Sequence, residues 1–197
     1  MGHIYCLMGK SASGKDTIYS RLLEDEKLSL SRIIPYTTRP IRSGESEGTE
    51  YHFTDKAGLD RLEAAGKVIE CRCYHTFYGD WYYFTVDDGI FVEDNDYLII
   101  GTLESYKKIR DYYGQDKVVP LYIELDDGIR LERALGRERM QKEPKYEELC
   151  RRFLADAEDF SEDRLSALGI DTRYINDDLD SCLQKLEEKI WTLRSIR

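Results

Sequence analysis

The chain has 197 residues, of which 41% are hydrophobic and 35% charged, a composition that suits one compact domain with a sizeable core. The 39 acidic and 29 basic side chains leave a net charge of −10, which argues against non-specific binding to nucleic acid. No apolar run approaches the roughly 18 residues of a membrane span. Because the first residues also lack the basic-then-apolar pattern of a signal peptide, we expect a cytoplasmic protein without a membrane segment.

A glycine-bearing loop near the N-terminus is the most informative local feature. An apolar run over residues 3–8 predicts a buried strand, and a helical pattern covers residues 17–23. Between them lies the sequence Gly9-Lys10-Ser11-Ala12-Ser13-Gly14-Lys15-Asp16. A strand, a glycine loop with a lysine and a helix in this order are typical of a phosphate-binding loop. The alternative is a plain Gly/Ser-rich turn that leads into a helix, and the flanking strand and helix favour the phosphate-binding loop. We expect the donor nucleotide to contact Gly9, Ser11, Ser13, Gly14, Lys15, Asp16 and Thr17.

Four later apolar runs, at residues 32–34, 97–100, 118–125 and 173–175, predict further buried strands. Helical patterns separate most of them, at residues 103–113, 127–135, 146–168 (either continuous or broken) and 179–196. Strands that alternate with helices predict an α/β fold with a parallel sheet covered on both faces. Residues 36–90 interrupt this order with short aromatic-rich strands at 51–53, 68–70 and 81–86 and a helix at 59–65, which indicates a small antiparallel β insertion.

Cysteine and histidine show no metal-ligand spacing in this chain. Cys6, Cys71, Cys73, Cys150 and Cys182 are scattered, and so are His3, His52 and His75. We therefore expect reduced thiols that pack as small apolar side chains.

Residues 130–152 carry a local excess of positive charge, with eight basic and five acidic side chains. This excess is consistent either with a local anionic ligand or with a solvated helix that carries mixed salt bridges. Arg133 and Arg137 are spaced i, i+4 and so share one helical face, where a phosphate would remove their mutual repulsion.

The segment 36–53, YTTRPIRSGESEGTEYHF, resembles the guanylate kinase signature TTR-x-x-R-x-G-E-x-x-G-x-x-Y-x-F. Asn176-Asp177 is similar to a turn of the same family, and Arg133 to Arg137 with Arg152 is similar to its arginine-bearing lid. The resemblance covers nearly the whole chain. It implies a P-loop three-layer α/β sandwich with a five-stranded parallel core (1–35, 95–130 and 151–197), an acceptor-binding insertion (36–90) and a helical lid (131–150).

The same resemblance implies an enzyme that transfers the γ-phosphoryl group of ATP to GMP with Mg²⁺, binds small-molecule nucleotides and is a monomer or homodimer. The catalytic residues would be Lys15, Arg133, Arg137 and Arg152. The acceptor would be bound by Arg39, Arg42, Tyr51, Glu70 and Tyr82.

Arg39, Arg42 and Glu70 each have a chemical rationale and an alternative. Arg39 and Arg42 would clamp the acceptor phosphate with forked donors, or would instead pair with Glu45 or Glu47. Glu70 would accept N1–H and N2–H₂ of guanine, which adenine does not offer, or would be an exposed charge at a strand end.

Several positions depart from the family pattern. Asp16 stands where a hydroxyl residue normally touches Mg²⁺, and its carboxylate could bind the ion directly or through water. Pro35 replaces a serine that contacts the base. Thr102 follows the strand at 97–100 where the family has aspartates, and the nearest acid is Glu104. The stretch 74–85 is longer than the usual glycine–tyrosine turn, so Tyr78 and Tyr82 are both candidates for the acceptor phosphate.

These departures affect base recognition and metal binding, whereas the phosphate clamp is intact. GMP is therefore the leading acceptor. A ribose bisphosphate phosphokinase, whose family is similar and also carries Asp after the P-loop Lys, is the second hypothesis. A non-catalytic guanylate kinase-like binding module is a further alternative, and a regulatory P-loop ATPase is the weakest.

Overall fold

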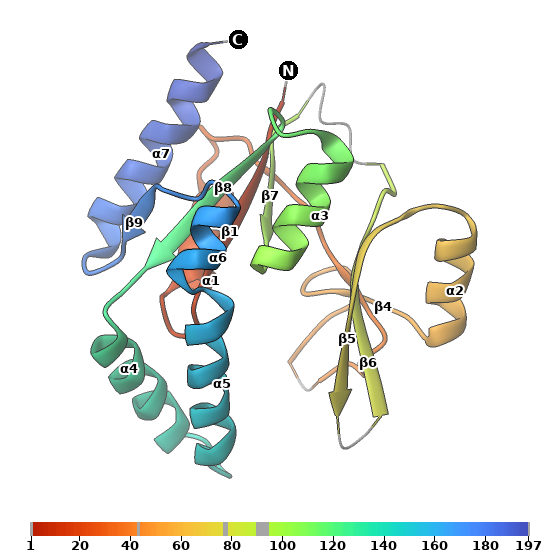
Figure 1. Ribbon diagram of the computed structural model, residues 1–197, viewed down its shortest axis with the longest axis horizontal. Coiled ribbons are helices and arrows are strands. Elements are labelled where there is room, and N and C mark those ends of the chain that lie inside the picture. The colour runs from red at the N-terminus through yellow and green to blue at the C-terminus, as the bar shows by residue number, and fades with distance from the viewer. Residues whose placement is uncertain (1, 43, 77–78, 90–94, 197) are drawn as a thin grey trace.

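The computed structural model describes residues 2–42, 44–76, 79–89 and 95–196 (Figure 1). Its core is a five-stranded sheet in the order β2-β7-β1-β8-β9, and every neighbouring pair is parallel. The strands are β1 (Ile4–Gly9), β2 (Ser31–Arg32), β7 (Tyr97–Ile100), β8 (Val118–Glu124) and β9 (Arg173–Ile175). The predicted α/β fold with a five-stranded parallel core is confirmed.

Helices cover both faces of the core sheet. Successive side chains of β1 point to opposite faces and pack against different helices. Ile4, Cys6 and Met8 pack in a cluster with α3 (Leu103–Tyr113) and α6 (Glu162–Ala167). Tyr5 and Leu7 point the other way, toward α1 (Lys15–Glu24) and α7 (Leu179–Ser195). Because both faces of a parallel sheet are buried, β1 is apolar throughout rather than alternating with polar residues. Among the described residues, no helix combines the length and apolar character needed to cross a bilayer.

A second sheet, in the order β4-β3-β6-β5, lies beside the core (Figure 1). Its strands are β3 (Tyr36–Thr37), β4 (His52–Phe53), β5 (Val68–Thr76) and β6 (Gly79–Val86). The hairpin of β5 and β6 is antiparallel, as predicted. Strand β3, which the sequence did not predict, is antiparallel to β6 and parallel to β4. A parallel pair requires a connection that returns to the starting edge, and the signature-bearing segment 38–51 makes that connection.

One predicted helix begins earlier than expected, and the structure decides between the two alternatives left open for residues 146–168. The helix of the second sheet, α2 (Lys56–Ala64), begins earlier because the Asp55 carboxylate caps it, accepting a hydrogen bond from Gly58 N at 2.7 Å. The helical stretch 146–168 is broken into α5 (Tyr146–Asp159) and α6, with Ser161 extended between them. Helix α4 (Asp127–Arg139) packs beside α5, and the pair projects beyond the core sheet (Figure 1).

Candidate active site

The glycine loop connects β1 to α1 and is held from one side by Asn176. The buried Asn176 amide donates to the Ser13 carbonyl at 2.7 Å, and Gly14 adopts φ 90° immediately before the helix. A Cβ at Gly14 would overlap the Asn176 side-chain nitrogen, so only glycine fits the turn. The Asn176-Asp177 turn singled out in the sequence therefore fixes the loop directly.

Arg130 and Asp156 hold the other side of the loop. Arg130 is 1% exposed and donates to the Ser11 carbonyl at 2.7 Å, while Ser11 N donates to the Asp156 carboxylate at 2.7 Å. Arg130 also pairs with Asp127 at 2.8 Å. The sequence placed Arg130 only in a basic segment, because its contact with a loop 119 positions away depends on the tertiary fold.

The buried loop interior offers an unsatisfied donor. The Ser13 hydroxyl is buried and has no hydrogen-bond partner within the part of the chain that the structure describes. Buried polar groups nearly always find a partner, so an oxygen-rich ligand in the loop would satisfy it. A Cβ at Gly9 would lie 2.6 Å from the Ile123 carbonyl, so glycine here allows the loop to start close to β8.

Lys15, Asp16 and Thr17 form the first turn of α1. The Lys15 side chain is 20% exposed, and its ammonium lies 3.8 Å from an Asp16 carboxylate that is 75% exposed. Thr17 is also exposed. Because Asp16 is largely exposed and the two charges are 3.8 Å apart, the pair contributes little to stability, so the Lys15 charge is free to meet an anion.

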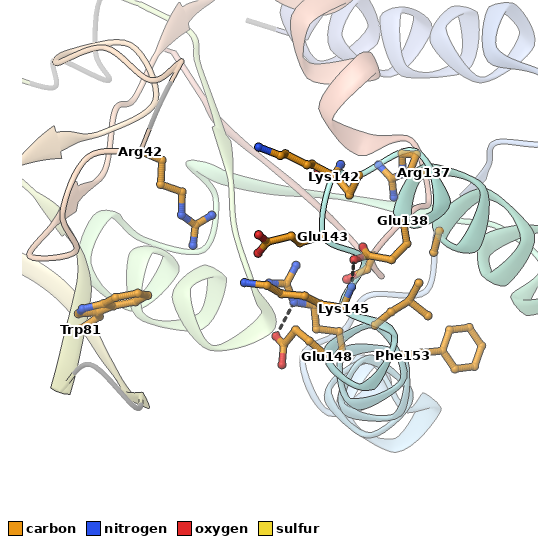
Figure 2. Close-up of a pocket in the computed structure, with 14 residues that line it drawn as sticks. Arg42, Trp81, Arg137, Glu138, Lys142, Glu143, Lys145, Glu148 and Phe153 are labelled. Atoms are coloured by element: carbon orange, nitrogen blue, oxygen red, sulfur yellow. Dashed lines mark hydrogen bonds and ion pairs between the residues drawn. The ribbon is translucent and has the colours of Figure 1, made fainter.

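Two clefts flank the loop. The larger, of about 840 Å³, is lined by Ser11 of the loop, Arg42 and Trp81 of the second sheet region, and residues of α4, α5 and their connection that include Arg137 and Arg152. Figure 2 shows Arg42 and Trp81 on one side of this cleft and Lys142, Glu143 and Lys145 on the other. The smaller, of about 630 Å³, is lined by Asp16, Pro35, Tyr51 and Ile100 among others. Loop residues and predicted acceptor residues thus border both clefts.

Arg39 and Arg42 have different environments. Arg39 is 3% exposed and binds the Glu45 carboxylate with both terminal nitrogens, at 3.0 and 2.8 Å, while its Nε donates to the Tyr83 hydroxyl at 3.1 Å. The hydrogen bonds from Arg39 hold the pKa of Glu45 below its usual value. Glu45 in turn accepts from Arg42 N at 2.8 Å, which leaves the exposed Arg42 side chain in the larger cleft. The pairing alternative therefore holds for Arg39 in this conformation, and Arg39 supports the turn that presents Arg42.

Of the tyrosines of β6, the structure brings Tyr83 rather than Tyr82 to Arg39. Tyr83 also meets the Tyr51 ring edge-on, with centroids 5.6 Å apart. Successive side chains of a strand point to opposite faces, and Tyr82 accordingly lies under Lys56, whose ammonium is 5.0 Å from its ring centroid. The structure thus does not place the predicted acceptor residue Tyr82 beside the arginines. Tyr78 lies outside the described residues.

Glu70 is buried within β5 rather than exposed at a strand end, so the alternative proposed for it does not hold. Its carboxylate accepts from Arg72 of the same strand and from Thr85 of β6.

The three predicted lid arginines reach the larger cleft or the loop. An Arg133 terminal nitrogen lies 3.9 Å from the position a Gly14 Cβ would take, and Arg137 lines the cleft one turn further along α4. Arg152 of α5 donates to Glu148 at 2.8 Å. The pKa of Glu148 is lowered to about 2. The hydrogen bond from Arg151 has the largest effect, burial acts in the opposite direction, and the hydrogen bond from Arg152 lowers the pKa further. Arg152 uses its Nε on Glu148, and no hydrogen bond within the described residues engages its terminal nitrogens.

The remaining departures also have a place in the fold. Thr102 caps α3 in a capping box with Ser105, and Glu104 pairs with Lys108 at 2.8 Å. The cysteines are free, as predicted, but Cys73 and Cys150 are exposed rather than packed as apolar side chains. Cys73, His75 and Asp80 bring potential ligand atoms within 4.8 Å of one another on the β5–β6 hairpin. The sequence did not indicate this cluster, because Asp80 reaches it only through the hairpin register that pairs it with His75.

Comparison with known proteins places this geometry in a family. The family model described as guanylate kinase matches residues 1–193. A guanylate kinase of Porphyromonas gingivalis is 28% identical over 196 residues, covering 96% of this chain and 97% of that protein. One of Zymomonas mobilis is 28% identical over 211 residues, covering 100% and 86%.

A guanylate kinase of Anaplasma phagocytophilum is 38% identical over 80 residues, which span 40% of this chain and 38% of that protein. The crystal structure of guanylate kinase from Anaplasma phagocytophilum superposes with a TM-score of 0.68 at 21% identity, covering 97% of this chain and 85% of that one, and this likeness supports the fold. Because the family model extends over nearly every residue that builds the loop, both sheets and the α4–α5 pair, the chain belongs to the guanylate kinase family.

Proposed function

We propose that the chain is an ATP-dependent nucleoside monophosphate kinase that transfers the γ-phosphoryl group of ATP to GMP. The observation that carries the proposal is the larger cleft, in which the loop residue Ser11, the acceptor arginine Arg42 and the lid arginines Arg137 and Arg152 meet. The family assignment and the structural match support GMP as acceptor and do not favour a sugar-phosphate kinase or a non-catalytic module. In this proposal, residues 1–35, 95–130 and 151–197 form the core, 36–90 the acceptor-binding insertion and 131–150 the lid.

Phosphoryl transfer requires the protein mainly to position two anions and to stabilise the charge that spreads over the transferred group. On the donor side, Lys15 and the loop supply the charge and the hydrogen-bond donors, and the Ser13 hydroxyl would gain its missing partner. Arg133 and Arg137 approach the same region from α4, so positive charge would meet the transferred group from two directions.

On the acceptor side, Arg42 is the guanidinium available to the phosphate. Arg39 acts through Glu45 by fixing the turn that carries Arg42, and Tyr51 borders the smaller cleft. Of the two arginines of the signature, Arg39 therefore positions the turn and Arg42 contacts the phosphate.

Asp16 would hold the magnesium ion that guanylate kinases use. Its carboxylate is a hard oxygen ligand, is largely exposed and lines the smaller cleft beside the loop, so the residue present fits the ion. When bound, Mg²⁺ would neutralise charge on the donor phosphates.

A panel of acceptors tests the proposal. With ATP and Mg²⁺, a coupled assay is expected to show ADP release with GMP and dGMP and little with AMP or ribose bisphosphate. Turnover with ribose bisphosphate or AMP but none with GMP would reject the guanine assignment. ATP hydrolysis that needs no acceptor would support an ATPase instead.

Arg42→Ala is expected to raise the KM for GMP about 10- to 100-fold while kcat changes less, because hydrogen bonds to a charged group contribute about 1.5–3 kcal/mol. Steady-state kinetics at saturating ATP measure this effect. The matched control is Arg61→Ala on α2, which removes an exposed arginine from the same predicted insertion outside both clefts. An Arg42→Ala enzyme with the acceptor kinetics of the control would refute the clamp assignment.

Substrate binding is expected to bring the lid and the insertion together, because both line one wide cleft and transfer requires that water be excluded. Small-angle X-ray scattering should show a smaller radius of gyration with a bisubstrate analogue than without it. An unchanged radius at saturating analogue would contradict closure.

A further inference from the structure

A buried ion pair between Glu70 and Arg72 lies near the start of β5, and the phosphate chemistry described above does not use it. Arg72 donates from Nε to Glu70 Oε2 at 2.9 Å and from Nη2 to Oε1 at 3.1 Å. Thr85, the cross-strand neighbour of Glu70, donates its hydroxyl to the same Oε1 at 2.8 Å. The Glu70 side chain is fully buried and the Arg72 side chain is 15% exposed.

The pair lies where the second sheet meets the core. Lys108 of α3 donates to the Cys71 carbonyl, between Glu70 and Arg72, at 3.2 Å. Burial opposes the charge of Arg72, but Glu70, with smaller contributions from Tyr74 and Tyr51, keeps its pKa above the usual value. Tyr51 lies near enough to Arg72 to affect its pKa and also lines the smaller cleft together with Pro35, so Tyr51 links the charged pair to the region where we expect an acceptor base.

Counting hydrogen-bond positions shows what the pair can offer a ligand. A carboxylate has about four lone-pair positions. Arg72 and Thr85 occupy both positions on Oε1, and Arg72 occupies one on Oε2, so a single acceptor position remains among the residues that the structure describes. Of its five N–H groups, Arg72 uses two on Glu70, which leaves donors on the terminal nitrogens.

The free acceptor position of Glu70 beside a free donor of Arg72 matches one edge of a 6-oxopurine base. Guanine and hypoxanthine both present N1–H next to the O6 acceptor, whereas adenine presents the same two kinds of group in the reverse order. The 2-amino group of guanine would find no second free position on Glu70.

We propose that Arg72 is a specificity-determining residue that reads the O6 atom of the acceptor base while Glu70 accepts N1–H, so that the site takes 6-oxopurine nucleoside monophosphates, IMP as well as GMP. This inference rests on the proposed nucleoside monophosphate kinase activity. It also explains how the chain can recognise a base although Pro35 and Thr102 offer less than the family pattern at their positions.

The wild-type enzyme tests the first half of the inference. The kcat/KM values for GMP and IMP should agree within about tenfold, because the missing 2-amino group costs only a peripheral interaction. A site that committed buried groups to both guanine donors would reject IMP by about 10⁴-fold or more. Rejection of IMP on that scale, with GMP accepted, would overturn the inference and leave the kinase proposal intact. Absence of turnover with every monophosphate would instead overturn the kinase proposal.

Two variants of Arg72 test the second half. Arg72→Ala should raise the KM for both substrates with little change in kcat or in the KM for ATP. It should also raise the GMP-to-IMP preference about tenfold, because Glu70 regains positions for the 2-amino group. Arg72→Lys, which keeps the charge and one donor, should restore part of the loss and serves if Arg72→Ala does not fold. Arg61→Ala is again the control. A merely structural role would leave the GMP-to-IMP ratio unchanged in both variants, and that result would overturn the inference.

Discussion

Replacing Lys15 with alanine is expected to lower kcat by about 10²–10³-fold, because the variant loses a positive charge that stabilises the transferred phosphoryl group. The fold should be unaffected. The ammonium of Lys15 has only a 3.8 Å pairing with a largely exposed carboxylate, and such a pair contributes about 0–1 kcal/mol. Steady-state rates with ATP and GMP, together with a thermal melt, measure both quantities.

Lys10→Ala is the matched control for this experiment. Lys10 lies in the same loop, but its ammonium is directed to Asp127 at 3.4 Å. Its removal should change kcat only a few-fold. Equal losses in the two variants would show that the loop responds to any change of charge and would refute the role assigned to Lys15.

Arg130→Ala should produce the largest loss of stability, about 3 kcal/mol in the free energy of unfolding. This is the lower end of the range for breaking a buried ion pair, because Asp127 is half exposed and the less exposed Asp156 keeps its hydrogen bond from Ser11 N. For a chain of this length the melting temperature should fall by roughly 6–12 °C. Activity should fall as well, since Ser11 loses its carbonyl partner and the loop loses its anchor.

Arg151→Ala tests whether the loss of stability expected for Arg130→Ala depends on the burial of the arginine. Its guanidinium binds Glu148 at 2.7 Å but is 65% exposed, so its loss should cost about 1 kcal/mol or less. A similar melting temperature for the two variants would contradict the anchoring role of Arg130.

The stability difference between wild type and Arg130→Ala should also depend on pH. Burial alone would raise the pKa of Asp127, but the hydrogen bond and charge of Arg130, with Lys10, hold it below its usual value. A group with a lowered pKa contributes stability above its unfolded value, and that contribution is lost as the pH falls through the folded one. The difference should therefore be full at neutral pH and shrink at acidic pH below the ordinary range of aspartate.

Much of the fold follows from local pattern. Apolar runs and the helices between them identify β1, β7, β8 and β9, because a buried parallel strand has no polar face to obscure its pattern. Strand β2 is exposed and overlaps the predicted run 32–34 only at Arg32. The glycine loop is equally local, since strand, loop and helix are consecutive. The β3–β4 pairing was not predictable in the same way, because short strands separated by an irregular segment give no signal of direction.

The candidate site was harder to predict wherever partners come from distant segments. The residues Arg39 and Arg42 lie in one motif, yet their division into a support and a free donor depends on which of them Glu45 and Tyr83 engage. The choice between Tyr82 and Tyr83 depends on which face of the second sheet carries the Arg39 side chain, and alternation along β6 alone leaves this open. Arg72 lies beside Glu70 in sequence, but its importance appears only once the pair is seen to be buried.

The account depends on two anion-binding groups that face each other across one cleft. A crystal structure with a bisubstrate analogue, in which adenosine and guanosine are joined through phosphates, tests this most directly. We predict that the phosphates of the adenosine half lie within hydrogen-bonding distance of Lys15 and those of the guanosine half within reach of Arg42. An analogue bound elsewhere, or one whose phosphates contact neither Lys15 nor Arg42, would contradict the account.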